Sequence, residues 1–198
     1  MIKSKAQELL VVISSPSGGG KTTITKRILR KNPEFWYSIS VTTREKRGNE
    51  VEGVDYYFVT EKEFKKKIQR EEFVEWAKVH NHYYGTLKKT IHQAKKKGKT
   101  LLFDIDIQGG LALKRKFQDS VLIFVLPPSY QVLKQRLRKR GTEKKEEMKT
   151  RLLTASKEIK YWSRYDYVVI NRKIEEAVKE VEAIILAERL KTQRIYQK

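Results

Sequence analysis

The sequence predicts an α/β fold in which a parallel β-sheet core is flanked by helices. Apolar runs rich in branched residues recur along the chain, helix-period segments lie between them, and a glycine-rich loop follows the first run. Strands that are apolar along their whole length are typical of a sheet covered on both faces, usually a parallel one. The expected strands are Leu9–Ile13, Leu101–Ile105, Val121–Leu126 and Tyr167–Ile170.

Helical segments alternate with these strands. They are predicted over Lys21–Lys31, Leu87–Lys97 and Tyr130–Lys139. A last segment places apolar residues on one helical face, namely Ile174, Ala177, Val178, Val181, Ile184 and Ile185. This alternation favours layers of helices packed on a central sheet.

Two regions interrupt the alternation. Residues 36–60 carry β-branched and aromatic residues around a charged, glycine-containing turn, which predicts a small β-rich insertion of short antiparallel strands. Residues 136–160 are highly charged, and Gly141 and Thr142 separate two helical patterns. We expect a solvated helical hairpin there, an element of the kind that moves.

Composition limits the classes of function. With 198 residues, the chain is expected to form one domain. It has no cysteine, which excludes a disulfide framework, a thiolate nucleophile and cysteine-built metal centres. The three histidines, His80, His82 and His92, are expected to be ordinary surface or half-buried residues rather than metal ligands.

The formal net charge of +20 suits anionic partners, such as nucleotides, nucleic acid or an acidic membrane surface, without choosing between them. The lysine runs at 65–67 and 95–97 fit a solvated face better than a nucleic-acid site, although nucleic-acid binding stays possible. No apolar run is long enough to cross a membrane, and the first apolar run precedes a glycine-rich loop rather than a cleavage site. We expect a cytoplasmic protein without a membrane partner.

The glycine-rich loop has the context of a phosphate-binding loop, because a strand precedes it and a helix follows it. Gly18, Gly19 and Gly20 permit positive φ angles that turn successive amide N–H groups inward. Lys21 supplies a positive charge for the β- and γ-phosphates, and the Thr22 hydroxyl can ligate Mg²⁺. The strict motif has glycine where this chain has Ser15, and the alternative is a flexible surface loop before a capped helix.

A second group of residues fits a guanine nucleotide. Guanine presents N1–H and N2–H₂ as adjacent donors, and Glu75 and Asp106 are acceptors when ionised. A carboxylate at the base end selects guanine over adenine by about 10⁴ or more, because adenine would leave it unpaired. Asp104 and Asp106 alternate at a strand end, which predicts a functional site. Arg44 and Arg47 suit a phosphate, which guanidinium binds bidentately.

The chain resembles the guanylate kinase family from about residue 8 to residue 188. The resemblance rests on a series of motifs in order: SSPSGGGKTT, SISVTTREKRGNEVEGVDYYFV, FVEW, NHYYGT, DIDIQG and RLRKRGT. It implies a P-loop NTPase-type core at 8–35, 98–130 and 165–190. It also implies a GMP-binding region at 36–97 and a lid at 131–164.

The resemblance implies roles for matching residues. The ATP site would comprise Ser15, Pro16, Ser17, Gly18, Gly19, Gly20, Lys21, Thr22, Thr23, Arg136, Arg140 and Asn171. The GMP site would comprise Ser40, Arg44, Arg47, Tyr56, Glu75, Tyr84, Thr86, Asp104 and Asp106. The catalytic charges would come from Lys21, Arg44, Arg136, Arg140 and Arg151, with Mg²⁺ on Thr22 and Asp104 nearby.

The implied reaction is ATP + GMP to ADP + GDP, in purine nucleotide metabolism. Its acceptor is an ionised phosphate oxygen, so it needs no general base. Besides Ser15, the chain departs from the family pattern at Lys46, often proline, and at Arg172, usually acidic. Two alternatives stay open: a guanylate kinase-like binding module without catalysis, and a nucleotide kinase with another base preference. The sequence does not decide between a monomer and a homo-oligomer.

Overall fold

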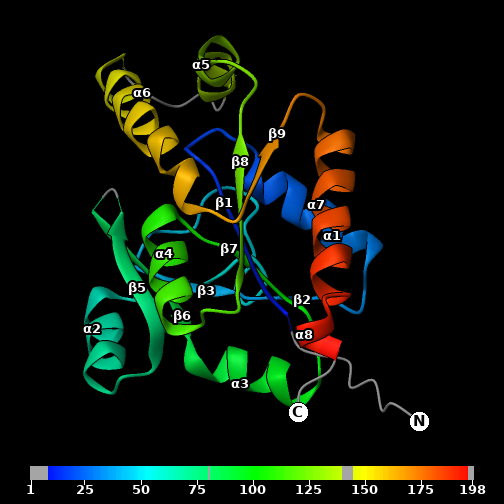
Figure 1. The fold of residues 1–198 in the computed structure, drawn as a ribbon. Coiled ribbons are helices and arrows are strands. Elements are labelled where there is room, and N and C mark those ends of the chain that lie inside the picture. The colour runs from blue at the N-terminus through cyan, green and yellow to red at the C-terminus, as the bar shows by residue number, and fades with distance from the viewer. Residues whose placement is uncertain (1–8, 80, 140–144, 196–198) are drawn as a thin grey trace.

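The computed structural model describes residues 9–79, 81–139 and 145–195. Its main sheet has five strands in the order β2-β7-β1-β8-β9, and every pair is parallel (Figure 1). The strands are β1 (Leu10–Ser14), β2 (Trp36–Tyr37), β7 (Leu101–Asp104), β8 (Val121–Leu126) and β9 (Tyr167–Ile170). The predicted parallel-sheet core is therefore confirmed.

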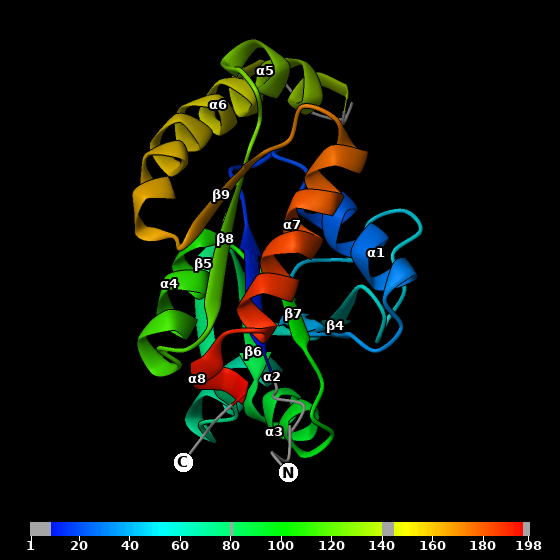
Figure 2. The ribbon, with the colours of Figure 1, turned by 45° about the vertical axis from the view of Figure 1, so that its right-hand side comes forward.

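Helices cover both faces of this sheet, as Figure 2 shows. On one face, Val11 and Ile13 of β1 pack with α1 (Lys21–Lys31) and α7 (Ile174–Arg189). On the other face, Leu10 and Val12 pack with α3 (Lys88–Lys96) and α4 (Ile107–Lys116). Alternate β1 side chains thus enter two separate cores, which is why the whole strand is apolar.

The second sheet has the order β4-β3-β6-β5, and α2 (Glu61–Gln69) packs on it. Its strands are β3 (Ser40–Thr42), β4 (Tyr56–Phe58), β5 (Phe73–Val79) and β6 (His82–Leu87). The expectation of antiparallel strands throughout residues 36–60 is wrong. β3 pairs with β4 in parallel, because the segment between them is long enough for the chain to cross back. β2 pairs with β7 in the main sheet.

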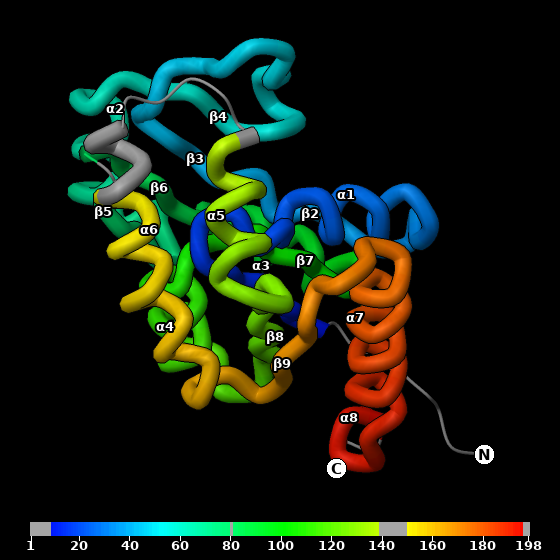
Figure 3. The backbone as a smooth tube through the Cα atoms, turned by 90° about the horizontal axis from the view of Figure 1, so that it is seen from above, coloured from blue at the N-terminus to red at the C-terminus, as the bar shows by residue number. Residues whose placement is uncertain are grey.

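Two helices form the top of the molecule in Figure 1, beyond the carboxyl ends of the main strands. They are α5 (Tyr130–Lys139) and α6 (Lys145–Ile159), and they share a small apolar cluster that includes Leu133, Leu137 and Ala155. A 3-10 segment, Lys160–Arg164, then leads to β9. Viewed from above, α5 lies over the core and α6 beside it (Figure 3).

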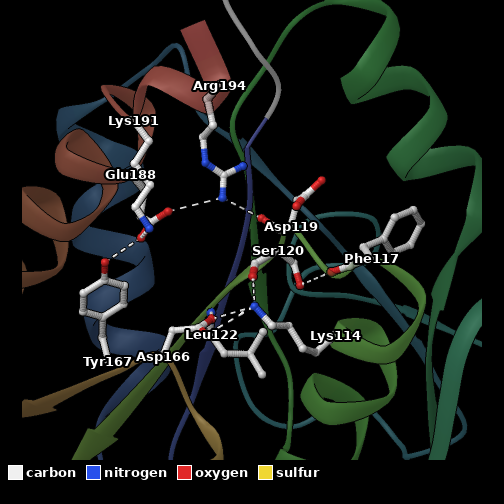
Figure 4. Close-up of polar contacts among 10 residues, drawn as sticks. All are labelled: Lys114, Phe117, Asp119, Ser120, Leu122, Asp166, Tyr167, Glu188, Lys191 and Arg194. Carbon is white, nitrogen blue, oxygen red and sulfur yellow. Dashed lines mark hydrogen bonds and ion pairs between the residues drawn. The ribbon is translucent and has the colours of Figure 1, made fainter. Parts of the chain in front are cut away.

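At the opposite end, the short helix α8 (Thr192–Ile195) is held by a polar cluster (Figure 4). Glu188 is buried and binds Tyr167 Oη at 2.5 Å, Lys191 Nζ at 2.6 Å and Arg194 Nη2 at 3.2 Å. Arg194 also donates to the Asp119 carbonyl at 2.7 Å. These bonds tie α7 and α8 to the amino-terminal ends of β8 and β9.

The predicted elements agree closely with this structure. The α1 and α5 helices and the β8 and β9 strands have the predicted bounds. The β7 strand ends one residue earlier than predicted, and β1 and α3 differ by one residue at both ends. In the part of the chain that the structure describes, we find no helix long and apolar enough to cross a lipid bilayer.

Candidate active site

A cavity of about 270 Å³ lies at the carboxyl ends of the main strands. The glycine-rich loop, the second sheet, the end of β7 and α6 all contribute side chains to it. Its lining includes Ser15, Pro16, Ser17, Gly18, Gly20, Lys21, Thr22, Ser40, Arg47, Tyr56, Glu75, Tyr84, Asp104, Asp106 and Arg151, all predicted site residues. The fold thus brings together residues that are up to 136 positions apart, from Ser15 to Arg151.

The glycine-rich loop joins β1 to α1 with Gly18 at φ 86° and Gly20 at φ 100°. The sequence pattern groups Gly19 with them as a glycine that permits a positive φ, but Gly19 does not adopt one. Gly19 is required for space instead, because a Cβ there would lie 2.6 Å from Ser15 Cβ. Among the described non-glycine residues, positive φ occurs at Glu71 and Asn81, so Ser15 occupies the first loop position without left-handed strain.

Lys21, the first residue of α1, pairs with Asp104, the last residue of β7. The Asp104 side chain is 2% exposed. Burial alone would lower the pKa of the Lys21 ammonium, but the Asp104 carboxylate beside it raises that pKa above its ordinary value. Lys21 is therefore held in its charged form at the cavity floor.

The other side of the loop faces a second pocket of about 280 Å³, lined by Gly18, Gly20, Thr23, Arg136, Asn171 and Ile174. The buried Asn171 side chain donates to the Gly19 carbonyl at 2.9 Å, and Arg136 donates to the Asn171 carbonyl at 2.9 Å. A Cβ on Gly20 would lie 2.4 Å from Asn171 Nδ2. Arg136 and Asn171 therefore support the loop from behind, on the side away from Lys21.

Glu75 is a buried carboxyl at the far end of the main cavity. Burial raises its pKa to about 7, the nearby Asp106 carboxylate adds to the increase, and Thr86, its partner across the β5–β6 pair, opposes it. Gly109 lies against it, since a Cβ there would meet Glu75 Oε2 at 2.7 Å. An acceptor with a pKa near neutrality changes its charge close to physiological pH.

Asp106 lines the cavity beside Glu75, but it lies outside β7, which ends at Asp104. The expectation that both aspartates alternate on a strand is therefore wrong. Asp106 is the N-cap of α4, and its Oδ1 accepts from the Gly109 amide at 2.9 Å. Capping fixes the Asp106 carboxylate at the start of α4.

Arg44 is buried behind the cavity wall rather than on it. It forms two bonds with Glu50, at 2.8 and 2.9 Å, and stacks over the Tyr56 ring at 5.2 Å. Burial alone would lower the pKa of Arg44, but Glu50 raises it above its ordinary value. The Arg47 amide donates to the same carboxylate at 2.8 Å, while the Arg47 side chain lines the cavity.

Of four tyrosines in the second sheet, two pack in the interior and two line the cavity. Tyr57 and Tyr83 pack against the core of the second sheet, whereas Tyr56 and Tyr84 line the cavity with their rings 6.1 Å apart. Adjacent residues of a strand point to opposite faces, so each pair places one ring in the interior and one in the cavity.

Some cavity residues were not predicted from the sequence. They are Val79, His82, Gly85, Ile105 and Glu158. Glu158 accepts from the Ser17 amide at 3.2 Å. The spacing of seven residues from Arg151 is a signal that could have revealed it, because such residues share a helix face. The predicted site residue Arg140 lies outside the described residues.

The chain matches the family model for guanylate kinase over residues 7–188. It is 49% identical to a guanylate kinase of Clostridium perfringens over 94% of this chain and 87% of that protein. The chain belongs to the guanylate kinase family. A second guanylate kinase, from Caldanaerobacter subterraneus, is 47% identical over 96% of this chain and 92% of its own length.

A solved guanylate kinase structure, from Anaplasma phagocytophilum, is similar to the fold described above. Its TM-score is 0.81 at 34% identity, and the match covers 96% of this chain and 90% of that chain. The matches thus cover nearly the whole lengths of the guanylate kinases concerned, and the predicted family and fold are both confirmed.

Proposed function

We propose that this chain transfers the terminal phosphoryl group of ATP to GMP, giving ADP and GDP. The observation that carries the proposal is that one cavity holds Lys21 of the glycine-rich loop at one end and the Glu75 and Asp106 carboxylates at the other. Such a cavity suits two polyanions with a guanine base at the far end. Because ATP and GMP are cytoplasmic metabolites, we place the reaction in the cytoplasm, in purine nucleotide metabolism and GMP recycling.

The guanine would lie against Glu75 and Asp106, with Ser40 and Thr86 nearby. Glu75 and Thr86 face one another across β5 and β6, and Ser40 lies on the neighbouring strand β3. Ionised carboxylates accept from guanine N1–H and N2–H₂, and adenine offers no N1–H. The base preference therefore follows from buried acceptors that adenine would leave unpaired.

The GMP phosphate would be held by Arg47, Tyr56 and Tyr84, which line the cavity, and by Arg44 once it exchanges Glu50 for the phosphate. Guanidinium groups bind phosphate oxygens bidentately. Asp104 would act indirectly, through its ion pair with Lys21.

ATP would place its phosphates along the glycine-rich loop, from Ser15 to Thr23, at the positive end of α1. Its nucleoside would extend towards the second pocket, where Arg136 and Asn171 lie. Lys21, Arg44, Arg136, Arg140 and Arg151 are the proposed catalytic charges. We assign residues 131–164 as the lid and 36–97 as the GMP-binding region, with the core in the remaining parts of residues 8–190.

Mg²⁺ fits this site as a nucleotide-bound ion. Among the described residues, no group of three or more His, Cys, Asp or Glu side chains could hold a metal on its own. Mg²⁺ commonly takes its ligands from substrate phosphates and water, with one or two protein oxygens. Thr22, which lines the cavity, would be the protein ligand. When bound, the ion neutralises charge on the transferring phosphates.

The chain's own residues then align and neutralise two anions. The acceptor oxygen is already ionised, so no side chain needs to remove a proton. Lys21 draws the donor phosphates to the loop, and the arginines offset the repulsion between donor and acceptor. Water would have to be excluded by the lid, because water in the site would compete with GMP as acceptor.

The test is ADP formation from Mg-ATP with GMP, AMP, UMP and CMP as separate acceptors. Turnover with GMP alone is expected. Turnover with another nucleotide would still be a kinase reaction, but it would contradict the roles proposed for Glu75 and Asp106. Binding of GMP with no turnover on any acceptor would favour the binding-module alternative.

A further inference from the structure

The lid contacts three successive residues of the glycine-rich loop. A Cβ on Gly18 would meet the side chains of Leu133 and Leu137 of α5 at 3.2 Å, so these leucines lie directly on the loop. Arg136 of α5 approaches the Gly19 carbonyl at 3.4 Å. The α6 helix makes its contact through Glu158, which accepts from the Ser17 amide.

Glu158 brings a further carboxylate, besides those of Glu75, Asp104 and Asp106, to a cavity that is proposed to bind anions. Glu158 lines the same cavity as Lys21 and Thr22. A negative charge there opposes the binding of nucleotide phosphates, so substrate affinity alone does not account for it. Glu158 does accept a hydrogen bond from the Ser17 amide. A bond to an ionised carboxylate is stronger than a neutral one, so this bond can hold α6 in place against the loop.

The position of Glu158 on α6 determines what that bond can control. It lies one residue before the end of α6, next to the 3-10 segment that returns to the core. Arg151 lies seven residues earlier, two turns or about 10 Å along the helix. Both side chains line the cavity, and Ala155 between them packs in the α5–α6 cluster. Fixing Glu158 therefore fixes the base of the helix that carries Arg151.

We propose that Glu158 is a positioning residue that anchors the base of α6 to the phosphate loop through the Ser17 amide, so that Arg151 reaches the transferring phosphoryl group. This inference rests on the proposed function, which gives Arg151 its catalytic role. In this role Glu158 acts through the direction of α6 rather than on the transferring group itself. Its loss should therefore lower kcat more than it raises KM.

The experiment compares Glu158→Ala, Glu158→Gln and Glu158→Asp in the full chain. Alanine should lower kcat about tenfold or more, with KM for ATP and GMP changing about twofold or less. Glutamine should restore most of kcat, because its amide oxygen still accepts from Ser17. Aspartate keeps the charge, but its side chain is one methylene shorter, which leaves its carboxylate farther from the Ser17 amide. The kcat of this variant should therefore also fall. Lys157→Ala, on the exposed neighbour, is the matched control.

Double mutants separate this inference from the proposal on which it rests. If Glu158 acts through Arg151, Glu158→Ala should slow Arg151→Ala little further, whereas independent roles would give multiplied losses. A wild-type kcat in the folded alanine or aspartate variant would overturn the inference, and so would multiplied losses. An unimpaired Arg151→Ala enzyme would instead reject the catalytic role of Arg151, and the inference with it. Thermal melting of each variant identifies those that fold, and an unfolded alanine variant leaves the aspartate and glutamine variants to decide.

Discussion

Lys21 of the glycine-rich loop and Asp104 at the end of β7 form an ion pair that joins the first helix to the strand beside β1 in the main sheet. The Asp104 side chain is almost fully buried, whereas Lys21 keeps 24% of its side chain exposed towards the cavity. The lysine thus has two anionic partners available: Asp104 below it and, in the proposed complex, the ATP phosphates above it. Asp104 keeps the lysine charged beside the cavity in which the ATP phosphates would bind.

Replacing Lys21 should therefore have two separable effects. Lys21→Met should lower kcat about a hundredfold or more, because a charge that stabilises the transferring group is lost. It should also lower the free energy of unfolding by about 1–3 kcal/mol, because Asp104 is left buried without its cation. Steady-state kinetics and chemical denaturation measure the two effects.

The control is Lys21→Met combined with Asp104→Asn. The double variant should recover the lost stability, since no buried charge is then unpaired, and its kcat should stay low. Near-normal activity in the folded single variant would refute the assignment of the loop.

Glu75 should make the use of GMP depend on pH. With its pKa near 7, the free enzyme carries a protonated Glu75 below neutrality, and a protonated carboxyl is a weaker acceptor for guanine. We expect kcat/KM for GMP to fall as pH decreases through 7. Glu75→Gln should lower kcat/KM for GMP and remove this step, leaving the titration of the GMP phosphate near pH 6. An unchanged profile in the variant would exclude Glu75 from the base site.

The raised pKa of Glu75 should also make the stability of the protein depend on pH. The folded pKa of about 7 lies above the usual value of 4.5, so the folded protein loses stability as pH rises from about 4.5 to 7. Glu75→Gln lacks that loss. It should exceed the wild type in unfolding free energy by up to about 3 kcal/mol above pH 7, and the difference should shrink towards pH 4.5. Urea denaturation at several pH values measures it.

Gly19 and Ser15 should show second-site suppression. A methyl group on Gly19 would strike Ser15 Cβ, so Gly19→Ala should destabilise the loop by about 1–3 kcal/mol and weaken ATP binding. Ser15→Gly removes the struck atom and should restore much of both properties in the double variant. ADP binding by calorimetry and thermal melting check this. An equal defect in the single and double variants would mean that another contact excludes the methyl group.

The loop shows what sequence patterns can predict and where they stop. Strand, glycines, lysine and helix follow one another locally, so the pattern predicts the element bounds and the place of Lys21. The distinct needs of Gly18, Gly19 and Gly20 depend on which atoms approach them from elsewhere, including Ser15 and Asn171. A pattern of residue types contains no information on such distances, so it offers one explanation, a positive φ, for all three glycines.

The ion-pair partners of charged residues could not be predicted from the sequence either. Arg44 could be predicted to bind an anion, yet its partner Glu50 lies in a charged stretch where nothing distinguishes one carboxylate from another. The parallel pairing of β3 with β4 depends on how the chain between them crosses back, and the residue types of the two strands suit antiparallel and parallel pairing alike. The tyrosine pairs follow the two-residue period of strands, which puts one ring of each pair in the core and the other in the cavity, but the period alone does not say which.

Glu188 should stabilise the carboxyl-terminal helices without affecting catalysis. Burial alone would raise the pKa of Glu188, but its bonds to Lys191, Tyr167 and Arg194 outweigh burial and lower it. A lowered carboxyl pKa contributes stability above about pH 4.5, and that contribution is lost as pH falls through the folded value. Glu188→Gln should therefore reduce the unfolding free energy at pH 7 by about 1–3 kcal/mol, and less below pH 4.

The cluster lies at the amino ends of β8 and β9, away from the cavity, so kcat and KM of the variant should equal those of the wild type. Gln193→Ala, at an exposed neighbour, is the control for stability. A reduction in stability that persists undiminished at low pH would show that Glu188 acts by packing rather than by charge.

The pairing of Arg44 with Glu50 has a consequence for the end of the proposed reaction cycle. A cation that always has a counter-ion of its own exchanges one anion for another when a nucleotide arrives or leaves. The arriving GMP phosphate gains less than it would from an unpaired guanidinium, and the departing GDP leaves behind an ion pair instead of a buried, unpaired charge. The Arg44–Glu50 pair thereby favours rapid exchange of nucleotides over tight retention. That property suits an enzyme whose product carries more negative charge than the substrate it replaces.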